Sequence, residues 1–441
     1  MNVACVFFDV LYLPTASGAG MFFKKKIRST LKVICMKHRV VITGLGIISS
    51  LGTEADRVAK ALYHGKSGIC IDPERQKRGF FSPLTGHIQE FSPRFPLSRK
   101  QRKTTSEYVE WAIEAAYQAI HSAGLSPDDL RNEESGIIFG NDSSALATLE
   151  QVAILNDAGN TAAIGSGLIF RSMTSCITMN LNVLLGTHGA AWTVSGACAS
   201  GGHAVGQAAD LIRMGRQERM LCGGAQEINW ESMCSFDSLG AFSSRIDDPE
   251  GASRPFDISR DGLVPGGGAA ALLLERYDLA QKRGAPILGE IMGYGFSSDG
   301  KNISVPSETG LNRAMRMAMR EANVTRHDIS YICAHATATP AGDAMEAVNI
   351  LDLFGDAAIP VSSTKSMTGH ELWMSGTAQV VYTTLMAQNG FIAPNRNFTE
   401  GDGPCSRLAV VRETIQNPPK VALCNAAGFG GTNSCLVLSF A

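Results

Sequence analysis

The chain has 441 residues, of which 44% are hydrophobic and 18% are charged, and its formal net charge at pH 7 is -2. This length corresponds to two or three domain-sized units or to one large duplicated fold, with ample apolar material for a core. The balanced charge excludes a general attraction to nucleic acid or to a membrane surface as the basis of function. We therefore expect a cytoplasmic protein with neither kind of partner.

The eleven cysteines form no CxxC pair and no Cys/His cluster with the spacing of metal ligands. Most have apolar neighbours, as Cys222, Cys333 and Cys424 do. This pattern is typical of reduced, buried cysteines in a cytosolic protein. The sequence therefore predicts neither a metal site nor a bound cofactor.

Residues 1–35 differ in character from the rest of the chain. The apolar stretch Val3–Leu13 precedes the basic cluster Lys24–Lys26, whereas a secretory signal places its charges first. The stretch is also too short to span a bilayer. Met36 opens a segment that reads like a natural start followed at once by a strand. We interpret residues 1–35 as a disordered extension or an over-called translation start, with an organelle-targeting sequence as the weaker alternative.

From Val40 onward, short apolar segments alternate with amphipathic ones. The apolar segments lack a polar face and end in Gly, Asn or Asp, which is typical of strands in a sheet covered on both sides. They are Val40–Thr43, Gly136–Phe139, Met220–Gly223, Ala269–Leu274, Ile329–Cys333 and Val421–Cys424. Apolar residues with the helical period predict helices over Ser106–Ser122 and Leu311–Ala322. This alternation indicates an α/β fold.

One segment places a cysteine where a strand turns into a helix. The β-type run Ala191–Val194 enters a turn of small residues that contains Cys198, and a helical stretch follows to about Met214. The free N–H groups and the dipole at a helix N-terminus favour thiolate over thiol. From this segment alone, a structural cysteine in a tight turn is an equally good interpretation.

Three later segments carry further polar candidates and a flexible turn. His335 ends a buried strand, where α/β folds place their chemistry. Lys365 and His370 lie in a polar loop before a helix that is expected to begin near Glu371. The glycines around Phe429 permit a backbone that aims an N–H into a site. Taken singly, each of these residues also fits an ordinary structural position.

Taken together, the four segments resemble the β-ketoacyl synthase family of thiolase-like enzymes. The order Cys, His, Lys/His and then the string NAAGFGGTN carries the resemblance, which covers Val40 to Phe440. It is strongest to the bacterial ketoacyl-ACP synthase I branch, because the sister branch usually has a glutamate near Gly267. The resemblance implies a thiolase-like fold with αβαβα layers and two similar halves, each with a mixed five-stranded sheet. The nucleophile would lie in residues 36–285 and the His/Lys/His residues in residues 286–441.

The resemblance also implies a reaction and a partner. Family members are homodimers that perform a decarboxylating Claisen condensation in fatty acid biosynthesis, with both substrates carried on the phosphopantetheine of acyl carrier protein (ACP). Cys198 matches the residue that takes the acyl chain as a thioester, a role that suits a thiolate. The N–H groups of Cys198 and Phe429 match the oxyanion hole. His335 and His370 match the pair that holds the malonyl thioester carbonyl.

The remaining family roles fall on four kinds of position. Lys365 matches the lysine that organises the site, and Glu346 matches its acidic partner. Thr337 and Thr339 match hydroxyls that contact phosphopantetheine. A basic stretch lies where the family presents charge to acidic ACP, although an ordinary solvated surface explains it nearly as well. Its docking candidates are Arg99, Lys100 and Lys103.

The chain departs from the family pattern at several positions. Ala336 replaces the glycine of HGT, and Ala427 replaces an aromatic residue near the gate. In the family's GHSLGAAG motif, Trp373 and Met374 stand where small residues are usual. These changes are expected to reshape the acyl pocket or the gate. A specialised ketosynthase of a polyketide, aryl-polyene or resorcinol-type pathway is therefore the alternative function.

Two other functions fit the residues less well. Thiolase-type acyl-CoA transfer generally pairs the cysteine with one histidine and a second cysteine, whereas this chain offers His335 and His370. A chain-length-factor-like subunit would lack the nucleophile, which is present as Cys198.

Overall fold

The central stretches of the predicted strands are apolar because helices cover both faces of the sheets. In strand β7 (Gly268–Arg276), the odd-numbered positions from 269 to 273 enter one apolar cluster and the even-numbered positions from 270 to 274 enter another. Side chains alternate across a strand, so a doubly covered strand shows no polar face. The computed structural model describes residues 38–356 and 358–440, and the predicted extension at 1–35 lies outside the described residues.

Two sheets with the same topology make up the molecule. The first contains β1 (Val40–Ile48), β4 (Ser135–Gly140), β5 (Ala191–Val194), β6 (Arg219–Gln226) and β7 in the order β5-β4-β6-β7-β1. The second contains β8 (Gly289–Ser298), β9 (Tyr331–Cys333), β10 (Pro360–Ser362), β12 (Val421–Gly428) and β13 (Thr432–Ser439) in the order β10-β9-β12-β13-β8. All six predicted strands are present.

The pairing within the two sheets is also the same. In each sheet, the two pairs nearest the β5 or β10 edge are parallel and the other two are antiparallel. A short contact between β1 and β8, at Val41 and Ile42, joins them into one 11-stranded sheet, to which β11 (Ala409–Val410) adds an outer strand. A small separate sheet pairs β2 (Ile69–Ile71) with β3 (Leu84–Gly86).

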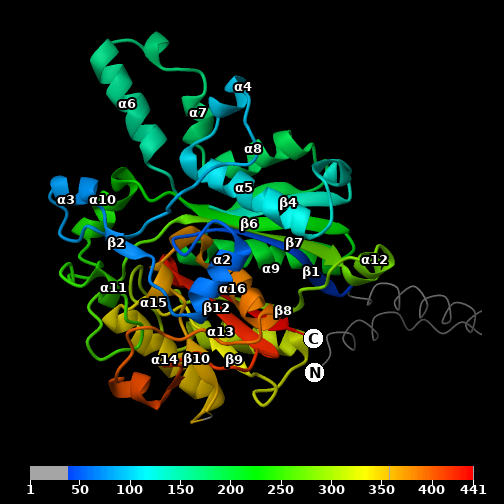
Figure 1. Cartoon of the computed structure of the whole chain (residues 1–441), viewed down its shortest axis with the longest axis vertical. Coiled ribbons are helices and arrows are strands. Elements are labelled where there is room, and N and C mark those ends of the chain that lie inside the picture. The colour runs from blue at the N-terminus through cyan, green and yellow to red at the C-terminus, as the bar shows by residue number, and fades with distance from the viewer. Residues whose placement is uncertain (1–37, 357, 441) are drawn as a thin grey trace, which may run out of the picture. The chain divides into compact units, whose positions relative to one another are not determined.

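Helices form three layers around the two sheets (Figure 1). The outer face of the first sheet carries α5 (Glu107–Ser122) and α8 (Cys176–Leu185). The outer face of the second carries α13 (Gly310–Ala322) and α14 (Pro340–Phe354). Between the sheets lie α9 (Ser200–Arg213) and α16 (Ser375–Gln388), whose apolar residues join both inner faces in one cluster. The predicted αβαβα fold is confirmed.

Shorter helices occupy the connections. They are α2 (Ala55–Tyr63), α3 (Pro73–Lys77), α4 (Arg99–Arg102), α6 (Leu146–Ala158), α7 (Leu168–Arg171), α10 (Trp230–Ser238), α11 (Pro249–Ala252), α12 (Tyr277–Lys282) and α15 (Lys365–Thr368). Helices α6 and α7 project from the layered body (Figure 1). Within residues 38–356 and 358–440, no helix combines the length and apolar character needed to cross a membrane.

Candidate active site

Cys198 lies in a sharp turn between β5 and α9. The 3-10 turn Ala197–Ala199 contains it, and Ala197 opens this turn in the left-handed conformation, with φ at 45°. The Ser200 hydroxyl donates to the Ala197 carbonyl at 2.6 Å and accepts from the Gly196 N–H at 2.9 Å. These bonds stabilise a backbone conformation that costs a non-glycine residue free energy. The strand-to-helix elbow predicted from the sequence is confirmed.

The second half repeats this arrangement after His370. The 3-10 turn Leu372–Met374 opens on Leu372, which is also left-handed with φ at 43°, and helix α16 then begins at Ser375. The prediction that this helix begins near Glu371 is therefore wrong by one turn. The left-handed residue and the 3-10 turn occupy the positions that the sequence assigned to the helix start.

The two central helices bring Cys198 and the histidines together. They approach so closely that a Cβ on Gly376 would lie 2.3 Å from the Gly202 nitrogen. As a result, the Cys198 Sγ is 3.1 Å from the His370 Nε2. The ring of His335 lies beside that of His370, with centroids 5.2 Å apart and planes at 86°. Residues from both halves thus form one cluster.

Both histidines are held in the neutral form. Burial, and then the charge of Lys365, lowers the pKa of His335 and of His370 well below the ordinary value. The His370 Nδ1 also contacts the Ser375 hydroxyl at 3.1 Å, which fixes the orientation of its ring. A neutral imidazole can accept a proton or donate a hydrogen bond, depending on its tautomer.

The protonation state of Cys198 differs from the expectation. The helix N-terminus was expected to favour the thiolate, but burial raises the pKa of the Cys198 thiol to about 12, against an opposing effect of Lys365. The resting group is therefore a thiol. It needs a base to become a nucleophile, and the His370 Nε2 at 3.1 Å is in position to accept its proton.

Glu346 organises the loop that carries His335. Its carboxylate accepts hydrogen bonds from the N–H of His335 at 2.9 Å, from the N–H of Ala336 at 2.6 Å and from the Asn425 side chain at 3.1 Å. Burial raises the pKa of Glu346 above its ordinary value, while its hydrogen bonds and the charge of the buried Lys365 act in the opposite direction. The predicted pairing of Glu346 with Lys365 is electrostatic, because the Lys365 Nζ forms no hydrogen bond within the described residues.

A second buried carboxyl group, that of Glu371, was not predicted from the sequence to belong to the site. It accepts a hydrogen bond from the Tyr382 hydroxyl and is only 2% exposed. Burial raises the pKa of Glu371 to about 7, while Tyr382 and Lys365 act in the opposite direction. The sequence does mark Glu371 as unusual, since it stands where the GHSLGAAG motif has a serine. The burial of Lys365 between two carboxyl groups required the tertiary structure.

A cavity of about 440 Å³ opens onto Cys198. The side chains of Thr337 and Thr339 line it, with their hydroxyl oxygens 3.1 Å apart. These two hydroxyls give the cavity a polar part. Its apolar lining includes Phe236, Leu263, Leu372 and Phe429.

The glycine-rich turn at Phe429 reaches the same place from strand β12. A Cβ on Gly428 would lie 2.8 Å from the Gly196 carbonyl, so the turn contacts the elbow that holds Cys198. The Phe429 side chain is 38% exposed and stacks on Phe236 with ring centroids 6.3 Å apart. The half-exposed ring at the cavity fits a gate better than a core residue.

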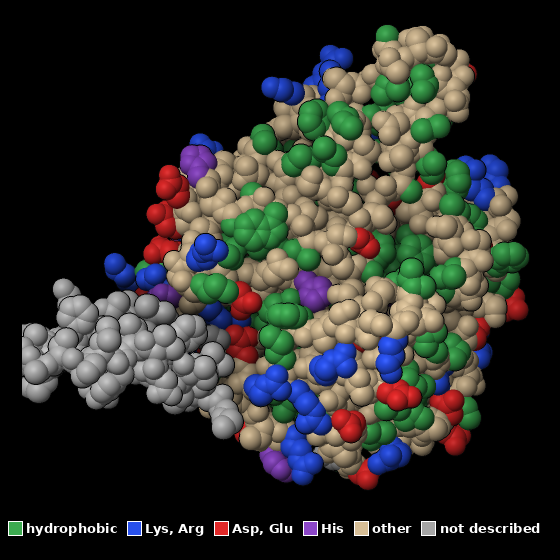
Figure 2. Space-filling view, turned by 180° about the vertical axis from the view of Figure 1, so that it is seen from behind, with side chains coloured by type: hydrophobic (Ala, Val, Ile, Leu, Met, Phe, Trp, Pro, Cys, Tyr) green, Lys and Arg blue, Asp and Glu red, His purple; other side chains and the backbone are tan. Residues whose placement is uncertain are grey.

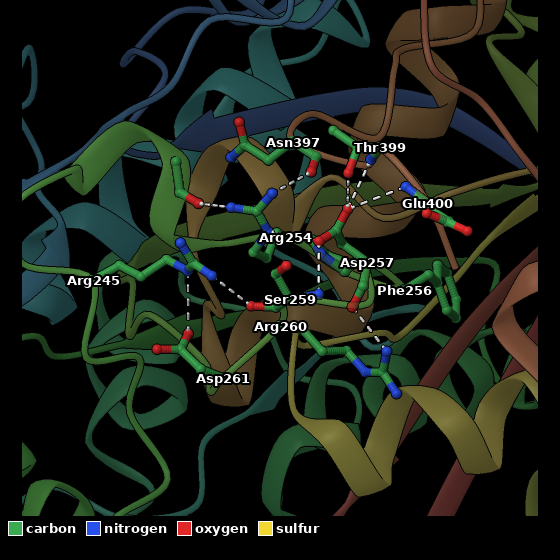
Figure 3. Close-up of polar contacts among 12 residues, drawn as sticks. Arg245, Arg254, Phe256, Asp257, Ser259, Arg260, Asp261, Asn397, Thr399 and Glu400 are labelled. Atoms are coloured by element: carbon green, nitrogen blue, oxygen red, sulfur yellow. Dashed lines mark hydrogen bonds and ion pairs between the residues drawn. The ribbon is translucent and has the colours of Figure 1, made fainter. Parts of the chain in front are cut away.

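A polar network fixes the wall next to Thr337. The buried Asp343 carboxylate accepts from the N–H of Thr337 at 2.9 Å and from that of Phe256 at 2.8 Å. Phe256 belongs to a loop that the buried Asp257 carboxylate ties down (Figure 3). The donors to Asp257 are Arg254, Ser259, Thr399 and Glu400. Buried and fully bonded, such a network gives the cavity wall a single conformation.

Comparison with known proteins agrees with this geometry. The family model for the β-ketoacyl synthase N-terminal domain matches residues 37–280, and that for the C-terminal domain matches residues 288–399. The chain belongs to the β-ketoacyl synthase family. A 3-oxoacyl-[acyl-carrier-protein] synthase 1 of Haemophilus influenzae is 37% identical over 91% of this chain and 98% of its own length.

Solved structures of other β-ketoacyl synthases share the fold. One from Burkholderia phymatum superposes with a TM-score of 0.87 at 32% identity, over 92% of this chain and all of its own. A type II polyketide ketosynthase in complex with its acyl-carrier protein superposes with a TM-score of 0.83 at 28% identity, over 92% of this chain and 100% of that one.

One departure of this β-ketoacyl synthase from the family pattern lies in the loop that follows His335. Ala336 replaces a glycine of the family pattern, and its backbone is not left-handed, so the methyl group causes no backbone strain there. The left-handed residue of this loop is Ala338, with φ at 68°. Its carbonyl accepts a hydrogen bond from the Gly262 N–H at 3.1 Å.

The docking candidates lie apart from the cavity of this β-ketoacyl synthase. Arg99 and Lys100 begin helix α4 and Lys103 follows it, and all three are exposed. None of them is among the residues that line the cavity. The backbone of Lys103 adjoins the α6–α7 segment, since a Cβ on Gly167 would lie 1.9 Å from its carbonyl oxygen.

Proposed function

We propose that this protein is a β-ketoacyl-ACP synthase, which condenses an acyl chain bound to Cys198 with malonyl-ACP to give 3-oxoacyl-ACP in fatty acid biosynthesis. The 3.1 Å contact between the Cys198 Sγ and the His370 Nε2, with His335 beside it, carries this proposal. The name of the Haemophilus relative supports the reaction, and its identity over nearly its whole length supports the transfer. No bound cofactor enters the proposed chemistry.

Acyl transfer comes first. The thiol proton of Cys198 passes to the His370 Nε2, and the sulfur attacks the thioester carbonyl of acyl-ACP. The N–H groups of Cys198 and Phe429 donate to the oxyanion that forms. The carbon–sulfur bond to phosphopantetheine then breaks, and the departing sulfur takes the proton, so the imidazole is neutral again. With Cys198 acylated, no thiol donates to the His370 Nε2, and the ring can take the Nε2–H tautomer that the next step requires.

Condensation follows on the same atoms. Malonyl-ACP places its thioester carbonyl where both neutral imidazoles can donate to it, with Thr337 and Thr339 contacting the pantetheine arm. Loss of CO2 leaves its electron pair on the α-carbon as an enolate, whose oxygen the imidazoles stabilise. The enolate carbon attacks the acyl carbonyl on Cys198, and the Cys198 thiolate leaves and takes a proton from solvent. Lys365 contributes its charge to this site without bonding to substrate.

The reaction can be tested by intact-mass detection of acyl-Cys198 and of the condensed product with purified acyl-ACP and malonyl-ACP. We expect Cys198→Ala to abolish acyl capture and condensation, while malonyl-ACP decarboxylation persists because both histidines and Lys365 remain. A wild-type protein that condenses no acyl-ACP of any length would refute the proposal. Replacement of Arg99, Lys100 and Lys103 by Ala should raise the KM for ACP substrates if this stretch docks the carrier.

We also infer that the protein is a homodimer. Strand β5 is the outermost strand of the 11-stranded sheet, and Trp192 on it is 42% exposed. Apolar side chains also gather on the projecting segment (Figure 2). The exposed apolar residues nearby are Leu149, Val152, Ile169, Phe170, Met173 and Val183. An exposed strand edge beside an apolar patch is typical of a self-association surface.

Sedimentation of the wild type should give the mass of two chains, and Val183→Glu should shift it to that of one. Val183 lies on α8 and is 77% exposed, so the substitution should not destabilise the folded monomer. Ile287→Glu, at an exposed apolar site just before strand β8, is the matched control and should leave the mass unchanged. A monomeric wild type would contradict the inference.

A further inference from the structure

Trp373 occupies the position in the second half that Cys198 occupies in the first. Cys198 is the middle residue of the turn Ala197–Ala199, and Trp373 is the middle residue of the turn Leu372–Met374. Each turn opens on a left-handed residue and leads into a central helix. The duplication therefore directs the indole into the same interface as the nucleophile.

The indole is buried and anchored beside the nucleophile. Trp373 is 4% exposed and belongs to the same apolar cluster as Cys198. Its ring centroid lies 6.2 Å from that of Phe236. Its Nε1 donates a hydrogen bond to the Ser143 carbonyl at 3.1 Å, across to the segment that follows β4. A buried indole with its N–H satisfied has little freedom to move aside.

The remaining members of the cluster show what kind of space surrounds the sulfur. They are Ala197, Met233, Phe242, Leu263 and Leu372, with Phe80, Ile228 and Phe236 packed against them. All are apolar, and three of them, Phe236, Leu263 and Leu372, also line the cavity that carries Thr337 and Thr339. An alkyl chain attached to Cys198 would gain free energy by packing among these apolar side chains.

The two half-reactions require the acyl chain to lie among the apolar side chains of this cluster, away from His335 and His370. During condensation, the acyl chain stays on Cys198 while the malonyl thioester contacts His335 and His370, so the histidine side must be free. The cavity that reaches Cys198 has Thr337 on its wall, and Trp373 is not among its lining residues. The indole thus fills apolar volume behind the sulfur that a long acyl chain would need.

We propose that Trp373 closes the acyl side of the Cys198 site and restricts the enzyme to short acyl groups such as acetyl and butyryl. The inference rests on the proposed function and specifies its substrate class. In the transfer, the bond from the acyl carbon to the pantetheine sulfur breaks, the bond to the Cys198 Sγ forms, and the thiol proton goes to the departing sulfur. Trp373 touches only the alkyl end of the chain, so it determines specificity.

The test measures the rate of Cys198 acylation by intact mass with acetyl-, butyryl-, octanoyl- and dodecanoyl-ACP. Wild type should react with dodecanoyl-ACP at least about tenfold more slowly than with butyryl-ACP. Trp373→Gly restores the residue type of the family motif and should remove that difference, with Trp373→Phe intermediate. Repeating the series with the N-acetylcysteamine thioesters excludes an effect of carrier docking.

Met374→Ala is the matched control. It restores a small residue at the adjacent position of the same motif, but Met374 packs in the core between the two sheets and not around Cys198. It should lower the thermal stability and leave the ratio of dodecanoyl to butyryl rates unchanged.

Each outcome separates the two proposals. Equal wild-type rates across the panel, or an unchanged ratio in folded Trp373→Gly, would overturn the role of Trp373 and leave the synthase function standing. No acylation by any donor would instead refute the synthase function. If Trp373→Gly does not fold, as thermal unfolding will show, the wild-type panel and Trp373→Phe decide.

Discussion

His370→Ala is expected to slow both the alkylation of Cys198 by iodoacetamide and the condensation reaction, whereas His335→Ala should slow condensation alone. The His370 Nε2 lies 3.1 Å from the Cys198 Sγ, whereas His335 lines the cavity beside the ring of His370. Loss of a positioned general base or hydrogen-bond donor typically costs about 10²–10⁴-fold in rate. Condensation should therefore fall by that factor in both variants.

The pH dependence of the wild-type alkylation gives an independent check. Because the pKa of Cys198 is about 12, the thiolate fraction is still increasing at pH 10. The rate should rise with pH over the whole range from neutral to 10 and reach no plateau. Peptide mass spectrometry of the exposed Cys234 in the same samples provides the control, and neither histidine substitution should alter its rate. Equal losses of Cys198 alkylation in the two histidine variants would contradict the assignment.

Glu346→Ala is expected to lower the free energy of unfolding by about 3–5 kcal/mol, because it removes one of the two buried carboxyl groups that compensate the buried Lys365 charge. It also removes the acceptor for the N–H groups of His335 and Ala336 and for the Asn425 side chain. Urea unfolding monitored by circular dichroism measures this change. Glu346→Gln retains one acceptor oxygen and should cost less.

Two comparison variants test whether the loss of stability comes from removing a buried carboxyl group beside Lys365. Glu250→Ala breaks the ion pair with Arg396, in which the Glu250 side chain is 63% exposed, and should cost no more than about 1 kcal/mol. Adding Lys365→Met to Glu346→Gln removes the buried charge that has lost one of its two carboxyl partners and should recover part of the lost stability. A Glu346→Ala variant as stable as Glu250→Ala would show that the buried carboxylate does not hold this loop.

Short stretches of sequence were sufficient to predict the strands that are buried on both faces. The stretches Ala269–Leu274 of β7 and Val421–Cys424 of β12 are apolar without interruption, and small residues mark the elbow at Cys198, so their type follows from short segments of sequence. Strand β8 was missed because it contains Gly289, Gly293 and Gly295. A Cβ on Gly293 would lie 2.2 Å from the Ala318 carbonyl, and one on Gly295 would lie 2.0 Å from the Ala314 carbonyl. These two glycines therefore serve the close approach of helix α13, which no local pattern reveals.

The sequence by itself determined the order of the site residues and the family that they indicate, because spacing between motifs is a property of the chain. Only the tertiary structure decided what state those residues are in. Burial, which depends on every surrounding layer, makes Cys198 a thiol and keeps His370 neutral. The packing of two equivalent turns against each other decided that Trp373, distant in sequence, fills the apolar space beside the nucleophile.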